Sequence, residues 1–181
     1  MGLNYLGSLV GTEVKVNRGG PDSIIGRLVA VQHDYLTLQL KDGTLVYIQL
    51  QHVKSISATN GNASRSYKTT HRAEQAHNFE GVLAQLKYTF VQINRGGPEK
   101  IEGVVVETWD HYLLIVVNNE IVRIPVFHIK SINAINKNNS NGNKSNKSNS
   151  SNKSNKSNKS NKATAAQIVA IKLMLKKYRS R

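Results

Sequence analysis

An internal duplication constrains the fold of this 181-residue chain more than any other feature. The stretch NRGGPDSIIGRLV at residues 17–29 returns as NRGGPEKIEGVVV at residues 94–106. When the chain is shifted against itself by about 77 positions, roughly two positions in five are identical over about 52 residues. After a one-residue deletion near Asn119, HVKSI at 52–56 also matches HIKSI at 128–132. The chain therefore contains two copies of one small unit.

Each copy has the pattern of short β-strands joined by tight turns. In NRGGP the two glycines accept positive φ and the proline fixes φ, so the chain turns sharply. Asp42-Gly43 and Asn118-Asn119 are typical of short hairpin turns. Gly26 and Gly103, each inside a strand pattern, predict bulges or tight bends. The predicted strands are 14–16, 25–31, 35–40, 45–49 and 53–57, then 91–93, 104–108, 112–117, 121–125 and 129–133.

A short helix is predicted before each set of strands, because apolar residues recur there at helical spacing: Leu3, Leu6, Leu9 and Val10, then Phe79, Val82, Leu83 and Leu86. Helix followed by five bent strands is the outline of an Sm-like barrel, and VKVNRGGP, DYLTL and IQLQHVKSI resemble parts of the Sm signature. The predicted fold is mainly β, with two tandem small Sm-like (SH3-like) five-stranded barrels at 1–58 and 77–135. A polar linker at 59–76 joins them.

The C-terminal part has a different composition. Residues 136–162 consist almost entirely of Asn, Ser, Lys and Gly, so we expect a disordered basic tail. Residues 163–181 predict an amphipathic basic helix that begins with a capping box of Thr164 and Gln167. Its apolar stripe would dock on the protein's own barrels, on a partner, or on a membrane surface. The stripe contains Ile168, Ile171, Leu175 and Tyr178.

Charge and composition narrow the possible functions. The formal net charge is +14, but residues 1–136 carry about 13 basic and 11 acidic side chains, and residues 137–181 about 12 basic and none acidic. The near-neutral repeats argue against a phosphate-binding surface on them. The chain has no cysteine, no secretory signal pattern and no apolar run long enough for a transmembrane segment. We expect no cofactor.

The repeated residues allow several kinds of site. The turns Asn17, Arg18, Gly19, Gly20, Pro21 and Asn94, Arg95, Gly96, Gly97, Pro98 are expected mainly to shape hairpins, with an anion-binding nest as the alternative. His52 and His128 are expected to pack or cap, because no further His or Cys stands at ligand spacing for a metal. The acidic residues are scattered singly, so no enzyme is expected.

The Sm resemblance also raises an RNA-binding module as the alternative function. Sm proteins place an Asn shortly after the loop Asp, where this chain has Leu36-Thr37 and Leu113-Leu114. No specific nucleic acid is therefore expected as a partner.

NRGGPEKIEGVVV followed by DHYLLIVVNNEIVRIPVFHIKSI closely resembles the repeat of the spore outer-coat protein B family (CotB) of endospore-forming bacteria. The resemblance implies a structural component of the spore outer coat, made in the mother-cell cytoplasm without a signal peptide, whose partners are itself and other coat proteins. It also implies a tail phosphorylated by the spore-coat kinase CotH. The family tail is rich in Ser-Lys-Arg, whereas this one has no Arg before Arg179. The candidate phosphoacceptors are Ser145, Ser148, Ser150, Ser151, Ser154, Ser157 and Ser160.

Overall fold

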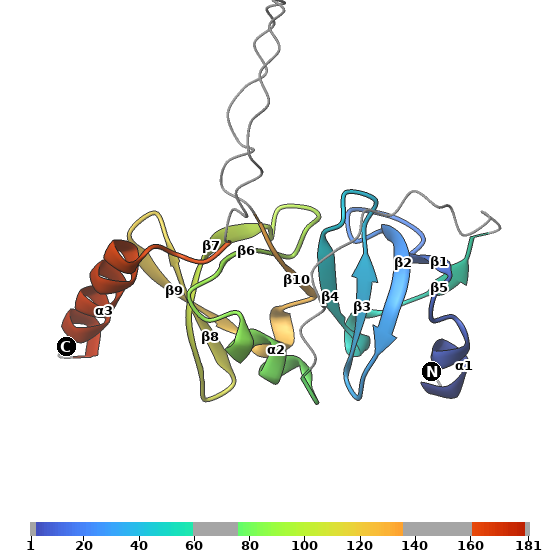
Figure 1. Cartoon of the computed structure of the whole chain (residues 1–181), viewed down its shortest axis with the longest axis horizontal. Helices are drawn as coiled ribbons and strands as arrows, with labels where there is room; N and C mark the ends of the chain where they lie inside the picture. The colour runs from blue at the N-terminus through green and yellow to red at the C-terminus, as the bar shows by residue number, and fades with distance from the viewer. Residues whose placement is uncertain (1–2, 60–75, 136–160, 180–181) are drawn as a thin grey trace, which may run out of the picture.

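The computed structural model describes residues 3–59, 76–135 and 161–179 and confirms a mainly β fold (Figure 1). Repeat 1 contains α1 (Leu3–Ser8), β1 (Glu13–Val16), β2 (Ile24–Val31), β3 (Tyr35–Gln39), β4 (Leu45–Gln49) and β5 (Ile56–Ala58). Repeat 2 contains α2 (Phe79–Gln85), β6 (Phe90–Ile93), β7 (Ile101–Trp109), β8 (Tyr112–Val117), β9 (Glu120–Pro125) and β10 (Ser131–Ala134). The helix α3 (Ala165–Arg179) follows.

A short 3-10 turn precedes the last strand of each repeat. These turns are η1 (Leu50–His52) and η2 (Val126–His128). Each turn ends at the histidine of the HVKSI or HIKSI motif, and β5 and β10 begin about two or three residues later than predicted.

The ten strands form one antiparallel sheet in the order β5-β1-β2-β3-β4-β10-β6-β7-β8-β9. Within each repeat the last strand lies beside the first, so both halves have the same internal order. Hydrogen bonds among the described residues do not close the sheet. In this part of the chain β5 and β9 are its two edge strands.

The two repeats join through β4 and β10. Ile48 lies opposite Ser131, and Tyr47 lies opposite Ile132, in antiparallel register. The backbone amide of Gln49 also donates to the carbonyl of Lys130 (3.1 Å). The repeats are therefore joined edge to edge through the middle of the sheet (Figure 1).

The bulges lie beyond the glycines that suggested them. The β2–β3 register shifts between Leu28 and Ala30, and the β7–β8 register shifts at the equivalent place. Gly26 and Gly103 stay in register with their neighbouring strands. They instead allow close approach, since a Cβ atom on Gly103 would lie 2.4 Å from the carbonyl oxygen of Val116.

The hydrophobic core of repeat 2 extends into repeat 1. Phe79, Val82 and Leu83 of α2 are fully buried in the same cluster as Tyr35 and Tyr47 of repeat 1. The side chain of Asn78 caps α2 by accepting from the amide of Gly81 (2.9 Å). Repeat 1 has its own smaller core, and of its predicted helix residues Leu6 is buried whereas Val10 is exposed. This core contains Val14, Val16, Leu28, Leu36, Leu38, Val46 and Ile48.

The C-terminal helix docks on repeat 2, the first of its three predicted alternatives. Ile171 and Leu175 are buried against Val106 and Leu114. The predicted capping box also forms at its start (Gln167 Oε1 accepts from the amide of Thr164 at 2.9 Å).

The two repeats differ on the face where α3 docks. In repeat 2 the face is apolar, with Val104, Leu114, Val116 and Ile121 around the helix. The equivalent positions of repeat 1 are mostly polar: Arg27, Thr37, Gln39 and Leu45. The apolar face of α3 buries more apolar surface on repeat 2 than it would on repeat 1. This explains why the helix docks on repeat 2. No helix in the described part of the chain has the length and apolar character required to cross a membrane.

Candidate functional site at the junction of the two repeats

The asparagine that opens each NRGGP turn is a structural clamp. Asn17 is buried with φ of 55°. Its side-chain nitrogen donates to the carbonyl of His52 (3.1 Å), and its oxygen accepts from the amide of Lys54 (2.7 Å). Its backbone amide donates to the carbonyl of Ser55 (2.8 Å). Asn tolerates left-handed backbone better than most residues, so one residue both turns the chain and holds the HVKS segment.

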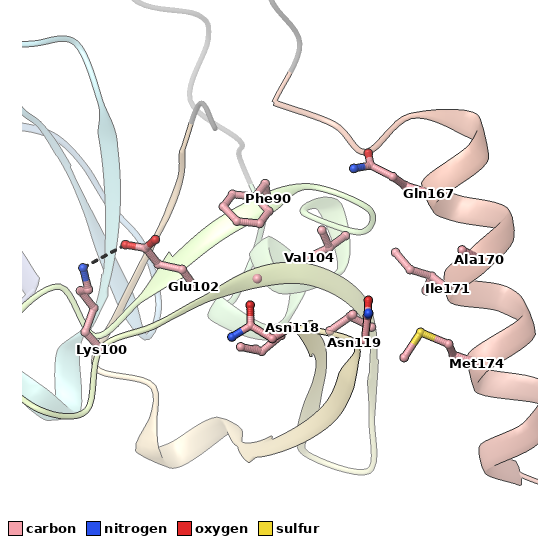
Figure 2. Close-up of a pocket in the computed structure, with 13 residues that line it drawn as sticks. Phe90, Lys100, Glu102, Val104, Asn118, Asn119, Gln167, Ala170, Ile171 and Met174 are labelled. Atoms are coloured by element: carbon pink, nitrogen blue, oxygen red, sulfur yellow. Dashed lines mark ion pairs between the residues drawn. The ribbon is translucent and has the colours of Figure 1, made fainter. Parts of the chain in front are cut away.

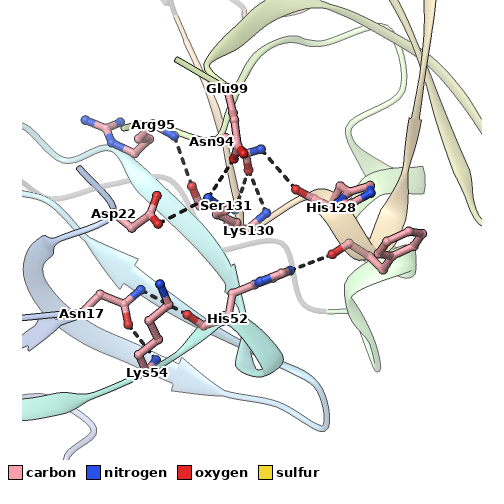
Figure 3. Close-up of polar contacts among 11 residues, drawn as sticks. Asn17, Asp22, His52, Lys54, Asn94, Arg95, Glu99, His128, Lys130 and Ser131 are labelled. Atoms are coloured by element: carbon pink, nitrogen blue, oxygen red, sulfur yellow. Dashed lines mark hydrogen bonds and ion pairs between the residues drawn. The ribbon is translucent and has the colours of Figure 1, made fainter. Parts of the chain in front are cut away.

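Repeat 2 contains the same clamp at equivalent residues (Figure 3). Asn94 has φ of 51°, donates to the carbonyl of His128 (3.1 Å), and accepts from the amide of Lys130 (2.7 Å). The amide of Arg95 also donates to the hydroxyl of Ser131 (3.4 Å). The two motifs that recur along the sequence therefore recur together because they bind each other.

The two NRGGP turns also meet across the junction. Gly96 faces the backbone of Pro21 so closely that a Cβ atom would lie 1.6 Å from the carbonyl oxygen of Pro21. At the equivalent Gly19, no atom of the described residues beyond its chain neighbours lies within 4 Å of the Cβ position. One glycine is required for contact between the repeats, whereas its counterpart contacts none of the described residues beyond its chain neighbours.

A lysine links the turns electrostatically. Lys130 Nζ lies 2.7 Å from Glu99 Oε2 and 3.4 Å from Asp22 Oδ2, so it bridges acidic residues of both turns (Figure 3). The hydrogen bond from Lys130 holds the pKa of Glu99 below its ordinary value, and the same bond raises the pKa of Lys130. Because Glu99 is exposed and Lys130 and Asp22 are partly exposed, the network orients the turns more than it stabilises the fold.

Two polar side chains of repeat 1 reach the 3-10 turn of repeat 2. The buried amide of Gln49 donates to the carbonyls of Val126 (2.7 Å) and Ile129 (2.8 Å). His52 Nε2 lies 2.8 Å from the carbonyl oxygen of Phe127. These bonds hold the 3-10 turn of repeat 2 against repeat 1 beside the β4–β10 seam, although the carbonyl of Val126 also accepts from the amide of Ile129 (3.0 Å).

The start of α2 completes the junction on its other side. The hydroxyl of Tyr35 donates to the carbonyl of Ala76 (2.9 Å), and Asp34 Oδ1 accepts from the amide of Phe79 (2.8 Å). Desolvation by burial raises the pKa of Tyr35. The junction thus combines strand pairing, two touching turns, a shared ion network and a capped helix.

No protein-family model matches this chain. Over 130 residues, 72% of its length, the chain is 39% identical to spore coat protein B of Bacillus subtilis (strain 168). The chain is a relative of spore coat protein B. The resemblance seen in the repeats is confirmed, and the chain spans about a third (34%) of the length of this curated relative.

The candidate site residues predicted from the sequence fall in two groups. All seven candidate phosphoacceptors, from Ser145 to Ser160, lie outside the described residues. The ten residues of the two turns are described, and the structure brings the turns together. Arg95 donates to Asn133 Oδ1 (3.1 Å) while Arg18 is exposed, so the two arginines have different surroundings.

Sequence reasoning missed the asparagine clamps and the Gln49 bonds. The clamp has a recognisable signal, because an Asn precedes RGGP in both copies and H-x-K-S returns with it. Gln49 has no such signal, since its counterpart is Pro125. His128 is exposed, and its ring lies against that of Phe127 with centroids 4.1 Å apart.

A second candidate site is a cavity of about 660 Å³ between α3 and repeat 2 (Figure 2). Ile171 and Met174 line its helix side, and Phe90 and Val104 line its sheet side. Its charged residues, Lys100 and Glu102, pair with each other at 3.0 Å. In the described part of the chain, no group of three or more metal-ligating side chains is arranged around a common point. The junction is therefore the better-defined site.

Proposed function

We propose that this protein is a non-enzymatic structural component of the bacterial spore outer coat, made in the mother-cell cytoplasm and assembled through its two repeats. The observation that carries the proposal is the 39% identity to spore coat protein B over 130 residues. The matched length exceeds either repeat alone, so the match includes residues of both repeats.

The geometry of the junction supports a scaffolding role. Gly96 and Pro21 are in contact, and both asparagines of the turns are used to hold neighbouring backbone. Residues used in this way shape and join the repeats. An anion-binding nest at the turns remains the alternative for the same residues.

The finer architecture belongs to this proposal. Each half has the strand order last, first, second, third and fourth behind a short helix, and this order supports an Sm-like barrel in each of 1–58 and 77–135. The linker at 59–76, the tail at 136–162 and the helical segment at 163–181 complete the proposed division. The alternative function for such barrels is RNA binding, which their near balance of charge disfavours.

The tail is proposed to be a substrate of the coat kinase CotH. Each phosphoserine adds about −1.5 to −2 charge at pH 7, so phosphorylation of the seven candidate serines would reverse the charge of a segment with lysines and no acidic residues. Phosphates beside lysines would then link tails to one another through many weak charge pairs. Other coat proteins with basic segments are the expected partners.

The test is to extract the protein from mature spores and to map its phosphates by mass spectrometry. We expect it in the coat extract, with phosphates confined to Ser145–Ser160. A protein that is present but unmodified would retain the structural role and remove CotH from it. A protein absent from spores would contradict the coat assignment, and single-stranded RNA binding by residues 1–135 would then be measured.

A further inference from the structure

We propose that the outer face of α3 binds an anionic lipid membrane while the helix stays docked on repeat 2. The outer face consists of five exposed residues on the side of α3 that points away from the sheet: Val169, Lys172, Leu173, Lys176 and Lys177. The helix lies at one end of the molecule, beyond the strands of repeat 2 (Figure 1). This inference goes beyond the proposed function and does not rest on it.

Contacts at three points along α3 fix which of its sides faces repeat 2. Before its first turn, the carbonyl of Asn161 accepts from the amide of Phe90 (3.0 Å). Ile171 is buried in the middle of the helix. At its end, the guanidinium carbon of Arg123 lies 4.6 Å from the centre of the Tyr178 ring. The opposite side of the helix therefore points to solvent in the folded protein.

Two large apolar side chains of the outer face are not used for docking. Val169 is 57% exposed and Leu173 is 60% exposed. They are four residues apart, so they are neighbours on the helix surface. Ile171 and Leu175 provide the buried contact with repeat 2. Adjacent apolar side chains that the fold leaves exposed fit a contact with another partner.

The charges beside these apolar residues are all positive. The three lysines of the outer face flank its two apolar residues, and α3 contains no acidic residue. Residues 136–160, which lead to the helix, add six lysines and no acidic residue. Lysines near an anionic lipid surface are each attracted to it, and salt screens this attraction. Charge complementarity therefore indicates an anionic partner.

The combination of apolar and basic residues favours a lipid surface over other anionic partners. A phosphate backbone or a run of carboxylates offers partners for the lysines, but none for Val169 and Leu173. At a bilayer surface, the apolar side chains of an amphipathic helix enter the boundary of the acyl chains, while its lysines extend to the headgroup phosphates. A membrane therefore uses both kinds of residue on the outer face.

Binding at this face is expected to be peripheral and reversible. The affinity of such a helix depends on the apolar area that it buries and on its attraction to anionic lipids. Only two large apolar side chains of the outer face are available to enter the lipid, so neither contribution is sufficient alone. Each contribution can be removed by substitution without removing the other.

The experiment measures co-sedimentation of the unphosphorylated full chain with lipid vesicles. One set of vesicles contains equimolar phosphatidylglycerol and phosphatidylcholine, and the other contains phosphatidylcholine alone. We expect the unmodified chain to bind the anionic vesicles and not the neutral ones. Its affinity should fall at least about tenfold between about 50 mM and about 500 mM salt, because salt screens the lysines.

Leu173→Gln tests the apolar contribution. It removes one apolar side chain of the outer face but keeps the net charge and a residue that favours helix. We expect it to bind about tenfold more weakly, from the lost burial of a leucine. Ile25→Gln is the matched control and should bind like the unmodified chain, because Ile25 is 49% exposed on β2 of repeat 1. Trypsin digestion checks that α3 stays docked in each variant.

A double variant tests the electrostatic contribution. Lys172→Glu combined with Lys176→Glu should bind the anionic vesicles at least about tenfold more weakly, because two attractions become repulsions at the lipid surface. Lys41→Glu combined with Lys54→Glu is the matched control. It makes the same change in net charge at exposed lysines of repeat 1, and it should weaken binding less than about threefold.

Three outcomes would overturn the inference: no binding to anionic vesicles in low salt, equally tight binding to neutral vesicles, or equal affinities of the docked Leu173→Gln and Ile25→Gln variants. Polyglutamate is tested as a soluble anionic polymer. If it binds the unmodified chain more tightly than the anionic vesicles do, and Leu173→Gln weakens that binding, the outer face takes an acidic polypeptide and the inference is wrong. All of these measurements use purified protein, so failure here is distinct from failure of the coat assignment.

Discussion

The carbonyl oxygen of Pro21 lies against the α-carbon of Gly96, where a side chain of any size would collide with it. This contact joins two copies of the same five-residue turn, and it explains why the second glycine-rich turn cannot vary freely. Gly19 is the matching glycine of repeat 1, but no described residue beyond its chain neighbours lies close enough to exclude a side chain there.

The first prediction compares the free energy of unfolding of two matched variants, Gly96→Ala and Gly19→Ala. In Gly96→Ala the new methyl group would lie 1.6 Å from the Pro21 oxygen, so the turns must separate. We expect a loss of about 1–3 kcal/mol in the free energy of unfolding, as for other overpacked sites. Gly19→Ala should change it by less than about 0.5 kcal/mol. Urea unfolding at low protein concentration measures both, and equal losses would show that the turns do not touch.

The asparagine clamps give a second prediction. Asn94→Ala removes three hydrogen bonds to the backbone of the HIKS segment and forces an alanine to φ of 51°. We expect a loss of about 2–4 kcal/mol in the free energy of unfolding, from unpaired backbone groups and from strain. Asn94→Gly removes the bonds without the strain, so it should be less destabilising by about 1 kcal/mol. If the two variants were equally stable, the positive φ at this position would carry no cost.

The clamp also shows what the sequence alone could provide. Alternation at Val14 and Val16 and hairpin signals at Asp42-Gly43 were sufficient to place the strands of both repeats within about three residues. Local patterns determine such elements because each strand and turn depends on its neighbours in sequence. Asn17 and Lys54 are far apart in the chain, so their hydrogen bond followed only from the folded structure.

The edge-to-edge junction between the repeats could not be predicted from the sequence for a similar reason. Tyr47 and Ile132 pair in neighbouring strands, but nothing in either local pattern says which strand will lie at an edge. Gln49 bonds across this junction, but its counterpart is Pro125, and one difference among the many between the two copies does not indicate an interface.

His111 should have a raised pKa. Its Nδ1 donates a hydrogen bond to Glu80 Oε1 of α2 at 2.7 Å, and this bond, followed by the charge of Glu80, raises the pKa of His111 above its ordinary value of 6.5. A histidine with a raised pKa in the folded state adds stability that is fully present below the pKa of the unfolded chain. That stability is lost as the pH rises through the folded pKa.

An NMR titration of the His111 ring protons measures this pKa directly. Glu80→Gln should return it toward the ordinary value, because both main causes of the shift are removed. Asp110→Asn is the control and should lower it less, since Asp110 is the smallest of the causes. A titration that Glu80→Gln leaves unchanged would contradict the contact between α2 and the β7–β8 turn.

The last prediction concerns the docking of α3. It compares one residue on the buried face of the helix with one on its exposed face. Leu175 is 9% exposed and packs on repeat 2, whereas Leu173 is 60% exposed. Leu175→Asp places a carboxylate among apolar side chains, and we expect it to weaken docking by about 3 kcal/mol, from lost burial and the cost of the polar group. The same substitution at Leu173 should leave docking unchanged.

Limited trypsin digestion of the full chain distinguishes these variants. Lys172 and Lys176 lie on α3, and an undocked short helix unfolds readily in water, so both bonds should be cut faster in Leu175→Asp. Leu173→Asp should be cut at the rate of the unmodified chain. If both variants were cut equally fast, the helix would owe its protection to something other than repeat 2, and the apolar face formed by Val104, Leu114, Val116 and Ile121 would need another explanation.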